Sequence, residues 1–134
     1  MKTVMVSGNF DPFHYAHLHY IKKASKLGYI LCVISTDTQV IQKKGKVNEP
    51  EDERLKMLDI ILEGAHIIGH SLINRWDEDT LVAKALKALK PDIFARGTDK
   101  TIADMPPEEK AVCDELGIKI IHIQGKVIHG SNFV

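Results

Sequence analysis

Short apolar runs rich in β-branched residues recur along the chain, and segments with helical spacing separate them. The runs are continuous rather than alternating, which is typical of strands covered on both faces of a parallel sheet. They occupy Thr3–Ser7, Ile30–Ser35, His66–Ile68, Ile93–Ala95 and Ile118–Ile123. The helical segments are Tyr15–Leu27, Glu51–Leu62, Thr80–Leu89 and Pro107–Leu116. This alternation predicts an α/β fold.

Strand–helix alternation with right-handed crossovers places helices on both faces of the sheet. We therefore expect a three-layer α/β/α sandwich with a five-stranded parallel sheet, a Rossmann-like arrangement. At 134 residues the chain suits a single domain spanning residues 1–134. In such a fold a ligand lies over the carboxyl ends of the strands at the topological switch point. The loops after the first and fourth strands are thus the expected site.

Glycines and prolines sharpen the predicted boundaries. Gly28, Gly64 and Gly117 each follow a helical run and are expected as left-handed closing residues, whereas Pro106-Pro107 suits a first helical turn. Residues 37–50 are polar and lysine-rich, and we expect an irregular, mobile loop there.

The amino-acid composition limits the binding partners and the cellular compartment that we expect. The chain has 18 lysine and arginine residues in total and 18 aspartate and glutamate residues in total. Its net charge therefore produces no overall electrostatic field that would favour nucleic acid or an acidic membrane surface. Cys32 and Cys113 are the two cysteines, and they are expected as reduced thiols. No apolar stretch approaches the roughly 20 residues of a membrane helix, and the start lacks the features of a signal peptide. We expect a cytoplasmic protein.

A polar and aromatic segment follows the first predicted strand, and the next helix begins within it. It reads Gly8-Asn9-Phe10-Asp11-Pro12-Phe13-His14-Tyr15-Ala16-His17. His14 and His17 are three residues apart, so both imidazoles can converge on one anion at a helix N-terminus. Taken alone, the pair is more typical of one buried and one solvent-facing histidine. A shared zinc ion is a third option, although no further ligand motif accompanies the pair.

The pattern Gly8-x-Phe10-Asp11-x-x-His14-x-x-His17 resembles the signature of the cytidylyltransferase-like nucleotidyltransferases. In that family the imidazoles of a His-x-Gly-His motif hold the triphosphate, so the resemblance implies that His14 and His17 bind phosphate. It also implies nucleotide contacts in the same segment, from Gly8, Asn9, Phe10, Asp11 and Ala16. Ala16 stands where the family has glycine, and its methyl group fills space where the nucleotide or the backbone would otherwise approach.

Further matches are closest to the glycerol-3-phosphate cytidylyltransferases, which carry Ser-Thr-Asp after the second strand, a lysine-rich loop, and an arginine that opens the next helix. The matching residues here are Ser35-Thr36-Asp37, Lys44 with Lys46, and Arg54. Lysines on a flexible loop can close over a triphosphate, although an isolated Lys-x-Lys also fits a solvated basic loop. The resemblance implies a catalytic clamp from the two lysines and substrate contacts from Asp11, Asp37, Arg54 and Trp76. Trp76 also fits a core or surface aromatic.

The segment after the fourth predicted strand, Arg96-Gly97-Thr98-Asp99-Lys100, is similar to a Gly-x-Asp turn of the family. The resemblance implies nucleotide contacts from Arg96, Gly97 and Asp99, although an ordinary polar turn would look the same. Near the end of the chain the likeness to the family weakens. Ser131 matches a nucleotide-binding position there, and His129 is a candidate substrate contact.

These features predict an enzyme in which a substrate phosphate attacks the α-phosphorus of a nucleoside triphosphate in line, without a covalent enzyme intermediate. No metal is expected to be fixed by the protein, and Mg²⁺ is expected to arrive with the nucleotide. CTP with glycerol 3-phosphate is the favoured pair, and a homodimer is expected from the family. Thr101-Ile102-Ala103-Asp104 has some likeness to archaeal flavin-adenylating relatives, which keeps ATP with FMN, or with a sugar phosphate, as the alternative. A catalytically silent nucleotide-binding module is the alternative of another class.

Overall fold

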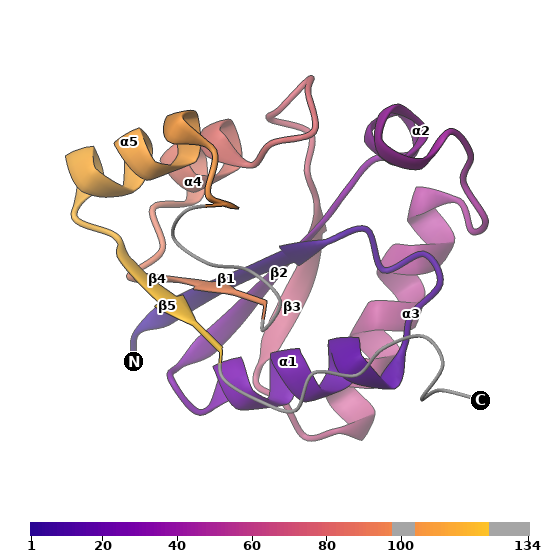
Figure 1. Ribbon diagram of the computed structural model, residues 1–134. Coiled ribbons are helices and arrows are strands. Elements are labelled where there is room, and N and C mark those ends of the chain that lie inside the picture. The colour runs from indigo at the N-terminus through magenta and orange to yellow at the C-terminus, as the bar shows by residue number, and fades with distance from the viewer. Residues whose placement is uncertain (98–103, 124–134) are drawn as a thin grey trace.

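Five parallel strands form one sheet in the computed structural model, which describes residues 1–97 and 104–123. The strand order is β3-β2-β1-β4-β5. In chain order the elements are β1 (Thr3–Gly8), α1 (Tyr15–Ser25), β2 (Tyr29–Ile34), α2 (Asp37–Lys44), α3 (Glu51–Gly64), β3 (Gly69–Ile73), α4 (Ala83–Leu89), β4 (Ile93–Arg96), α5 (Pro107–Leu116) and β5 (Lys119–His122). Figure 1 shows their arrangement around the sheet. The predicted α/β sandwich with a five-stranded parallel sheet is confirmed.

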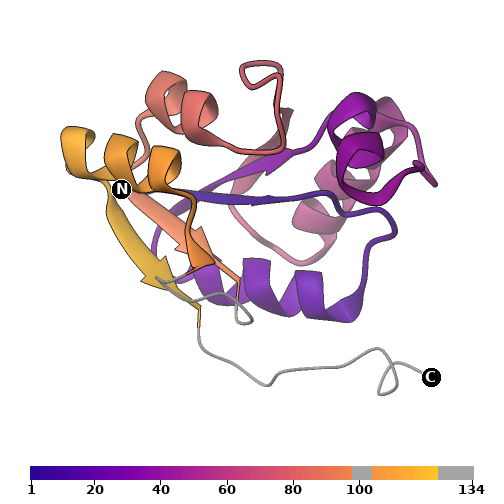
Figure 2. The ribbon, with the colours of Figure 1, turned by 45° about the horizontal axis from the view of Figure 1, so that its top comes forward.

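The strand order places the topological switch point between β1 and β4. The chain winds outward from β1 through β2 to β3, and it then returns to the other side of β1 to build β4 and β5. Because the crossovers are right-handed, reversing the direction also moves the helices to the other face of the sheet. Figure 2 shows α1 below the sheet and α4 and α5 above it. Loops therefore diverge at the carboxyl ends of β1 and β4.

Two separate cores stabilise the two faces of the sheet. Side chains alternate along each strand, so Val4 and Val6 pack against α1 and α3, whereas Met5 packs against α4 and α5. The cysteines follow the same division. Cys32 belongs to the first core and Cys113 to the second, and both are buried free thiols. The sheet lies between the two sulfur atoms, so they cannot form a disulfide bond. This agrees with the reduced thiols expected from the sequence.

The predicted loop over residues 37–50 is wrong in its first half, which forms helix α2. Thr36 caps this helix: its hydroxyl accepts a hydrogen bond from the Gln39 N–H at 3.1 Å, and the Gln39 side chain accepts one from the Thr36 N–H at 2.8 Å. Gly45 closes the helix with φ 83°. Only Gln39 and Val40 are buried in α2, so the helix lacks the apolar stripe that sequence reading depends on.

The third strand lies a few residues later than predicted. Residues 66–68 form the turn before it, and the strand itself is Gly69–Ile73, at one end of the sheet. A residue with a Cβ at Gly69 would bring that atom within 2.3 Å of the Ile30 carbonyl oxygen, so the close approach of β3 to β2 needs glycine there. An edge strand is not covered on both faces, which is why a continuous apolar run misidentified it.

The helix ends agree with the sequence in part. Gly117 closes α5 in the left-handed conformation and proline occupies the first turn of that helix, as predicted. Gly64 instead ends α3 within the helix, with Ala65 following as its cap, and Gly28 has φ 157°, outside the left-handed helical region. Helix α1 ends at Ser25 and α4 begins at Ala83, so both helices are shorter than predicted. No helix within the described residues is long and apolar enough to cross a membrane.

Candidate functional site

The histidine pair lies at the start of α1, after the segment that connects it to β1. His14 is the extended residue that precedes the helix, and His17 lies in its first turn. The His14 backbone N–H donates to His17 Nδ1 at 2.9 Å, and the two ring centroids are 5.5 Å apart. The two imidazoles therefore lie close together at the helix N-terminus, as their spacing predicts.

The hydrogen bond to His17 fixes the tautomer of its neutral ring. Because Nδ1 accepts a hydrogen bond, it carries no hydrogen, and Nε2 is then the protonated nitrogen. The rings of Phe10 and Phe13 also contact the His17 ring, with centroid distances of 5.1 and 5.4 Å, and they restrict its orientation. His17 is therefore held as a directed N–H donor, which is the group that a phosphate oxygen needs.

A cavity of about 550 Å³ lies at the switch point, with His17 in its wall. Its lining comes from the carboxyl ends of the strands, from α1 and α2, and from the segments around them. These residues are Ser7, Gly8, Asn9, Phe10, His17, Tyr20, Val33, Ser35, Lys43, Lys44, Val82 and Gly97. The volume lies within the range of small-molecule sites. Two lysines and an oriented imidazole make it suited to an anionic ligand.

The lysines at this cavity differ from the predicted pair. Lys43 approaches the Asn9 side-chain oxygen at 3.5 Å, and that oxygen also accepts a hydrogen bond from the Ser35 hydroxyl at 2.7 Å. Lys44 lines the cavity too, but as the last residue of α2 and not from a flexible loop. Lys46 lies beyond the helix and does not line the cavity. The structure therefore places Lys43 and Lys44 at the site, and Lys43 is a residue that the sequence reading missed.

Tyr20 is a second residue that the sequence reading missed. It lies one helical turn after His17, and its hydroxyl bridges the two strands at the switch point. It donates to the Ala95 carbonyl of β4 and accepts from the Ser7 N–H of β1 at 3.3 Å. Its position three residues from His17, on the same face of α1, was the available signal. Tyr20 joins the strands just where they diverge to open the cavity.

Asp11, which the resemblance implies as a substrate contact, is bonded within the protein in this structure. Its side chain is only 2% exposed, and its two oxygens accept the backbone N–H groups of Asn48 and Glu49, each at 2.7 Å. These bonds satisfy the buried charge and hold the segment that leads into α3. In this structure Asp11 is a structural residue.

Arg54 and Asp37 form the continuation of that buried network. The Arg54 guanidinium is 2% exposed and donates to the carbonyl oxygens of Asn9 at 2.9 Å and Ser35 at 2.7 Å. It also donates to the Asp37 carboxylate at 2.9 Å and to the Glu49 carbonyl at 2.9 Å. The Arg54 donors fix the loops behind the larger cavity, and Arg54 also lines the apolar cavity on the other side of the loop, so its substrate contact stays a prediction. Asp37 belongs to the same network and is half-exposed at its carboxylate.

Arg96 and Gly97 do lie at the switch point, as predicted. Both line a smaller hollow of about 130 Å³, which shares Lys43, Ser7 and Tyr20 with the larger cavity. Arg96 is buried, and its guanidinium lies 3.3 Å from the Nε2 atom of His122. Glu109 of α5 closes the hollow and accepts the Val82 N–H at 3.0 Å. Burial raises the pKa of Glu109, although the nearby Arg96 and Lys43 charges oppose that rise.

The remaining predicted residues fall into three groups. Gly8, Asn9 and Phe10 line the larger cavity, and an added Cβ at Gly8 would come within 3.0 Å of the Phe10 ring. Trp76 follows β3, is 37% exposed, and does not line that cavity, and Ala16 lies in the first turn of α1 without lining it. Asp99, Ser131 and His129 lie outside the described residues.

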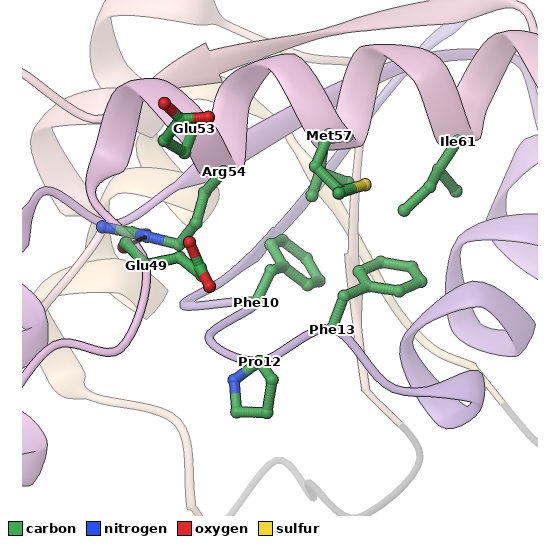
Figure 3. A pocket seen from close by; sticks show the side chains of 9 residues that line it. Phe10, Pro12, Phe13, Glu49, Glu53, Arg54, Met57 and Ile61 are labelled. Atoms are coloured by element: carbon green, nitrogen blue, oxygen red, sulfur yellow. Dashed lines mark hydrogen bonds between the residues drawn. The ribbon is translucent and has the colours of Figure 1, made fainter.

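An apolar cavity of about 410 Å³ adjoins the other side of the same loop (Figure 3). Phe10 and Phe13 face Met57 and Ile61 of α3 across it, and Glu49 and Glu53 lie at its polar end. The phenyl rings that orient His17 thus also form a wall of this cavity. Within residues 1–97 and 104–123, no group of three His, Cys, Asp or Glu side chains is arranged to hold a metal ion.

Comparison with known proteins gives consistent matches. Residues 5–129 match the sequence model of the family described as cytidylyltransferase-like. The chain is 29% identical to a FAD synthase of Methanohalophilus mahii over 123 residues, which cover 92% of this chain and 82% of the relative. It is 32% identical to a FAD synthase of Picrophilus torridus over 117 residues, which cover 86% of this chain and 77% of the relative.

Two solved structures match the chain over most of its length. The crystal structure of the lipopolysaccharide core biosynthesis protein from Thermoplasma volcanium has a TM-score of 0.72 and 26% identity, and the match covers 95% of this chain and 99% of that one. A universal stress protein from Archaeoglobus fulgidus matches with a TM-score of 0.57 at 12% identity, over 92% of this chain and 94% of that one. The second likeness concerns the fold alone.

Proposed function

The chain belongs to the cytidylyltransferase-like family and is a nucleotidyltransferase, and from this premise we propose that it transfers the adenylyl group of ATP to FMN. The observation that carries this proposal is the similarity to archaeal FAD synthases over most of both chains. The site at the switch point supports it, because it combines an oriented imidazole with lysines at the carboxyl ends of the strands.

The proposed reaction is a single in-line displacement. A phosphate oxygen of FMN attacks the α-phosphorus of ATP and forms a phosphoanhydride bond. The bond between the α-phosphorus and the bridging oxygen breaks, and that oxygen leaves with its electron pair as part of pyrophosphate. The products are FAD and pyrophosphate. No covalent enzyme intermediate is needed, because positioning and charge neutralisation supply the rate enhancement.

The described residues divide this work between them. His14 and His17 bind the triphosphate at the N-terminus of α1, where the helix dipole and the exposed N–H groups also attract negative charge. Lys43 and Lys44 approach from α2 and neutralise the charge that develops on the leaving pyrophosphate. Asn9, held by Ser35, keeps Lys43 directed into the site. Arg54 and Asp11 hold the loop backbones in place.

Flavin as the acceptor is supported by the apolar cavity beside the histidines. The isoalloxazine ring is flat and mostly apolar, and a cavity lined by two phenyl rings, Met57 and Ile61 matches that chemistry. Glu49 and Glu53 at one end, beside Arg54 (Figure 3), would accept a hydrogen bond from the imide N–H of the ring. On this basis we expect Met57→Glu to raise the KM for FMN by about tenfold, because the variant places one poorly matched polar group against the flavin ring. The KM for ATP should not change. Ile60→Glu, on the same helix but outside the cavity, is the matched control.

The decisive experiment measures FAD and pyrophosphate with ATP or CTP, and with FMN or glycerol 3-phosphate, in the presence of Mg²⁺. FAD formation from ATP and FMN that is lost in His17→Ala supports the proposal. Turnover only with CTP and glycerol 3-phosphate would overturn it in favour of the substrates expected from the motif resemblance. The variant control excludes a contaminating enzyme.

Three further expectations belong to this proposal. Mg²⁺ would enter with the nucleotide, bound by its phosphate oxygens, because hard divalent cations prefer oxygen ligands and retain water. A homodimer is proposed from the family resemblance alone. Sedimentation equilibrium tests the dimer directly. The cytoplasmic location stays a prediction.

A further inference from the structure

The strands β1 and β4 stop pairing with each other before either strand ends. Among the described residues their parallel pairing ends at Met5↔Phe94. β1 nevertheless pairs with β2 as far as Gly8, and β4 pairs with β5 as far as Arg96. The sheet therefore splits between β1 and β4 at the carboxyl ends of these strands, where the larger cavity lies.

The register of the two strands identifies the backbone hydrogen bond that the split removes. If the pairing continued, Ser7 would lie opposite Arg96, and its N–H would donate to the Ala95 carbonyl. Both groups point into the split. The carbonyls of Gly8 and Arg96 accept hydrogen bonds from the outer sides, where β2 and β5 lie, and successive backbone groups of a strand alternate in direction.

The hydroxyl of Tyr20 occupies the place of that missing bond. It accepts from the Ser7 N–H at 3.3 Å and donates to the Ala95 carbonyl at 2.5 Å. Because two consecutive hydrogen bonds replace one, the strands stand farther apart here than the roughly 4.8 Å of paired neighbours. Tyr20 reaches this place from α1 and is only 8% exposed. Its hydroxyl is thus a spacer between β1 and β4.

The ordinary need of a buried tyrosine for a partner does not account for this placement. The Ala95 carbonyl alone would supply that partner. Phenylalanine or leucine would fill the same position in the core, and Ser7 and Ala95 could then satisfy each other by direct pairing. A hydroxyl both donates and accepts, so it can satisfy two backbone groups while it keeps them apart. The split and the hydroxyl therefore belong together.

The split opens into the larger cavity. Ser7 and Tyr20 line that cavity, together with Gly97, the residue that follows β4. Tyr20 also lies three residues after His17, on the same face of α1. The two bonds from the Tyr20 hydroxyl therefore fix the helix that carries the His17 imidazole against both strands.

We propose that Tyr20 is a positioning residue, whose hydroxyl holds β1 and β4 apart and thereby sets the width of the cavity and the place of His17 in its wall. Tyr20 acts on the ligand through the strands and α1. The inference rests on the proposed function for the identity of the ligand, a nucleoside triphosphate. The spacer itself is a property of the fold and is tested without any ligand.

The first test uses the wild-type chain and measures NMR couplings across hydrogen bonds. A coupling between the Ser7 amide nitrogen and the Ala95 carbonyl carbon would report direct pairing of the strands. We expect none, because the Tyr20 oxygen lies between these groups. The Ile123 amide nitrogen and the Arg96 carbonyl carbon, whose groups bond directly at 2.9 Å, are the positive control. A Ser7–Ala95 coupling of similar size would overturn the proposal.

The second test compares Tyr20→Phe with Tyr29→Phe by calorimetric titration with ATP and with CTP. Each variant keeps its ring and loses one hydrogen-bonded hydroxyl. The Tyr29 hydroxyl bonds to His70 Nδ1 at 2.8 Å, at the start of β2 and away from the cavity. We expect Tyr20→Phe to weaken nucleotide binding by about tenfold, because the strands approach each other once the spacer is lost. Tyr29→Phe should leave the affinity unaltered.

Unaltered affinity in Tyr20→Phe, or equal weakening in both variants, would overturn the proposal. A purely structural hydroxyl would lower the unfolding temperature in both variants and leave the affinity of the folded chain unchanged. Failure of the wild type to bind either nucleotide would instead contradict the proposed function. The coupling measurement then still decides whether Tyr20 separates the strands, since it depends on neither a nucleotide nor a variant.

Discussion

Two regions on either side of the loop after β1 use similar side chains for opposite purposes. Behind the loop, Asp11 and Arg54 are almost fully buried, and their polar atoms bond to backbone groups and to the Asp37 carboxylate. In front of it, His17 and Lys43 line an open cavity of about 550 Å³. Asp11 and His17 are six residues apart in the sequence and belong to one motif.

The difference shows how a motif can combine support and chemistry. A buried charge must be paired within the protein, and residues such as Arg54 therefore hold the loop backbones in place. Removing such a side chain lowers the free energy of unfolding considerably. A charge at a cavity remains available to a ligand, so it contributes to binding and rate more than to folding. Removing a residue from each region should therefore affect different measurements.

The largest effect is expected from Arg54→Met. This change leaves the Asn9 and Ser35 carbonyls and the Asp37 carboxylate without their donor, and we expect a loss of about 3–5 kcal/mol in the free energy of unfolding. Urea denaturation measures it. Arg75→Met is the matched control, because that guanidinium is 63% exposed in its ion pair with Glu51 and should contribute less than about 1 kcal/mol. A loss in Arg54→Met as small as that in Arg75→Met would show that Arg54 is not a structural residue.

His17→Ala should lower kcat/KM by about 100- to 1000-fold, the effect of removing one preorganised donor to transferring phosphate. The accompanying loss of folding stability should be about 1–2 kcal/mol, because the bond to the His14 N–H at the helix start and the ring contacts with Phe10 and Phe13 are lost. Steady-state kinetics and urea denaturation separate the two effects. His70→Ala, an exposed histidine on β3, should retain activity. A stability loss as large as that of Arg54→Met would erase the distinction between the regions.

Lys43→Ala should lower kcat/KM by about 10- to 100-fold, and Lys46→Ala by less than about twofold. The physical reason is placement: Lys43 lies beside Asn9 in the cavity wall, whereas Lys46 lies outside it. The two substitutions make the same change in net charge three residues apart. A greater effect of Lys46→Ala would support the clamp inferred from the sequence over the one that the structure places.

The smallest effect is expected from Glu109→Gln, and its sign depends on pH. Burial raises the pKa of Glu109 in the folded chain, so the folded state holds its proton to a higher pH than the unfolded state. Wild-type stability should therefore fall as pH rises from the ordinary glutamate value through the raised one. The variant lacks this titration and should be more stable at neutral pH, by about 1 kcal/mol. Thermal unfolding across this range measures it, and parallel pH profiles would contradict the expectation.

The sequence was sufficient to locate much of the candidate site, but not to predict which groups each side chain contacts. Spacing placed His14 and His17 together at a helix start, since local geometry alone brings residues three apart onto one face. The structural bonds of Asp11 and Arg54 could not be predicted, for a tertiary reason. Their partners Asn48, Glu49 and Ser35 come from other parts of the chain, and no local pattern reveals that they consume these charges.

The alternation of buried strands and amphipathic helices was sufficient by itself to determine the sandwich, because periodicity reports directly which faces are covered. Two elements escaped that signal: α2 buries only Gln39 and Val40, and β3 lies at the edge of the sheet. Only the tertiary structure decided that Lys43 rather than Lys46 reaches the cavity, and that Tyr20 joins β1 to β4 at the switch point. Both depend on the relative placement of elements packed across the sheet, which arises from long-range contacts and is not encoded in any single segment.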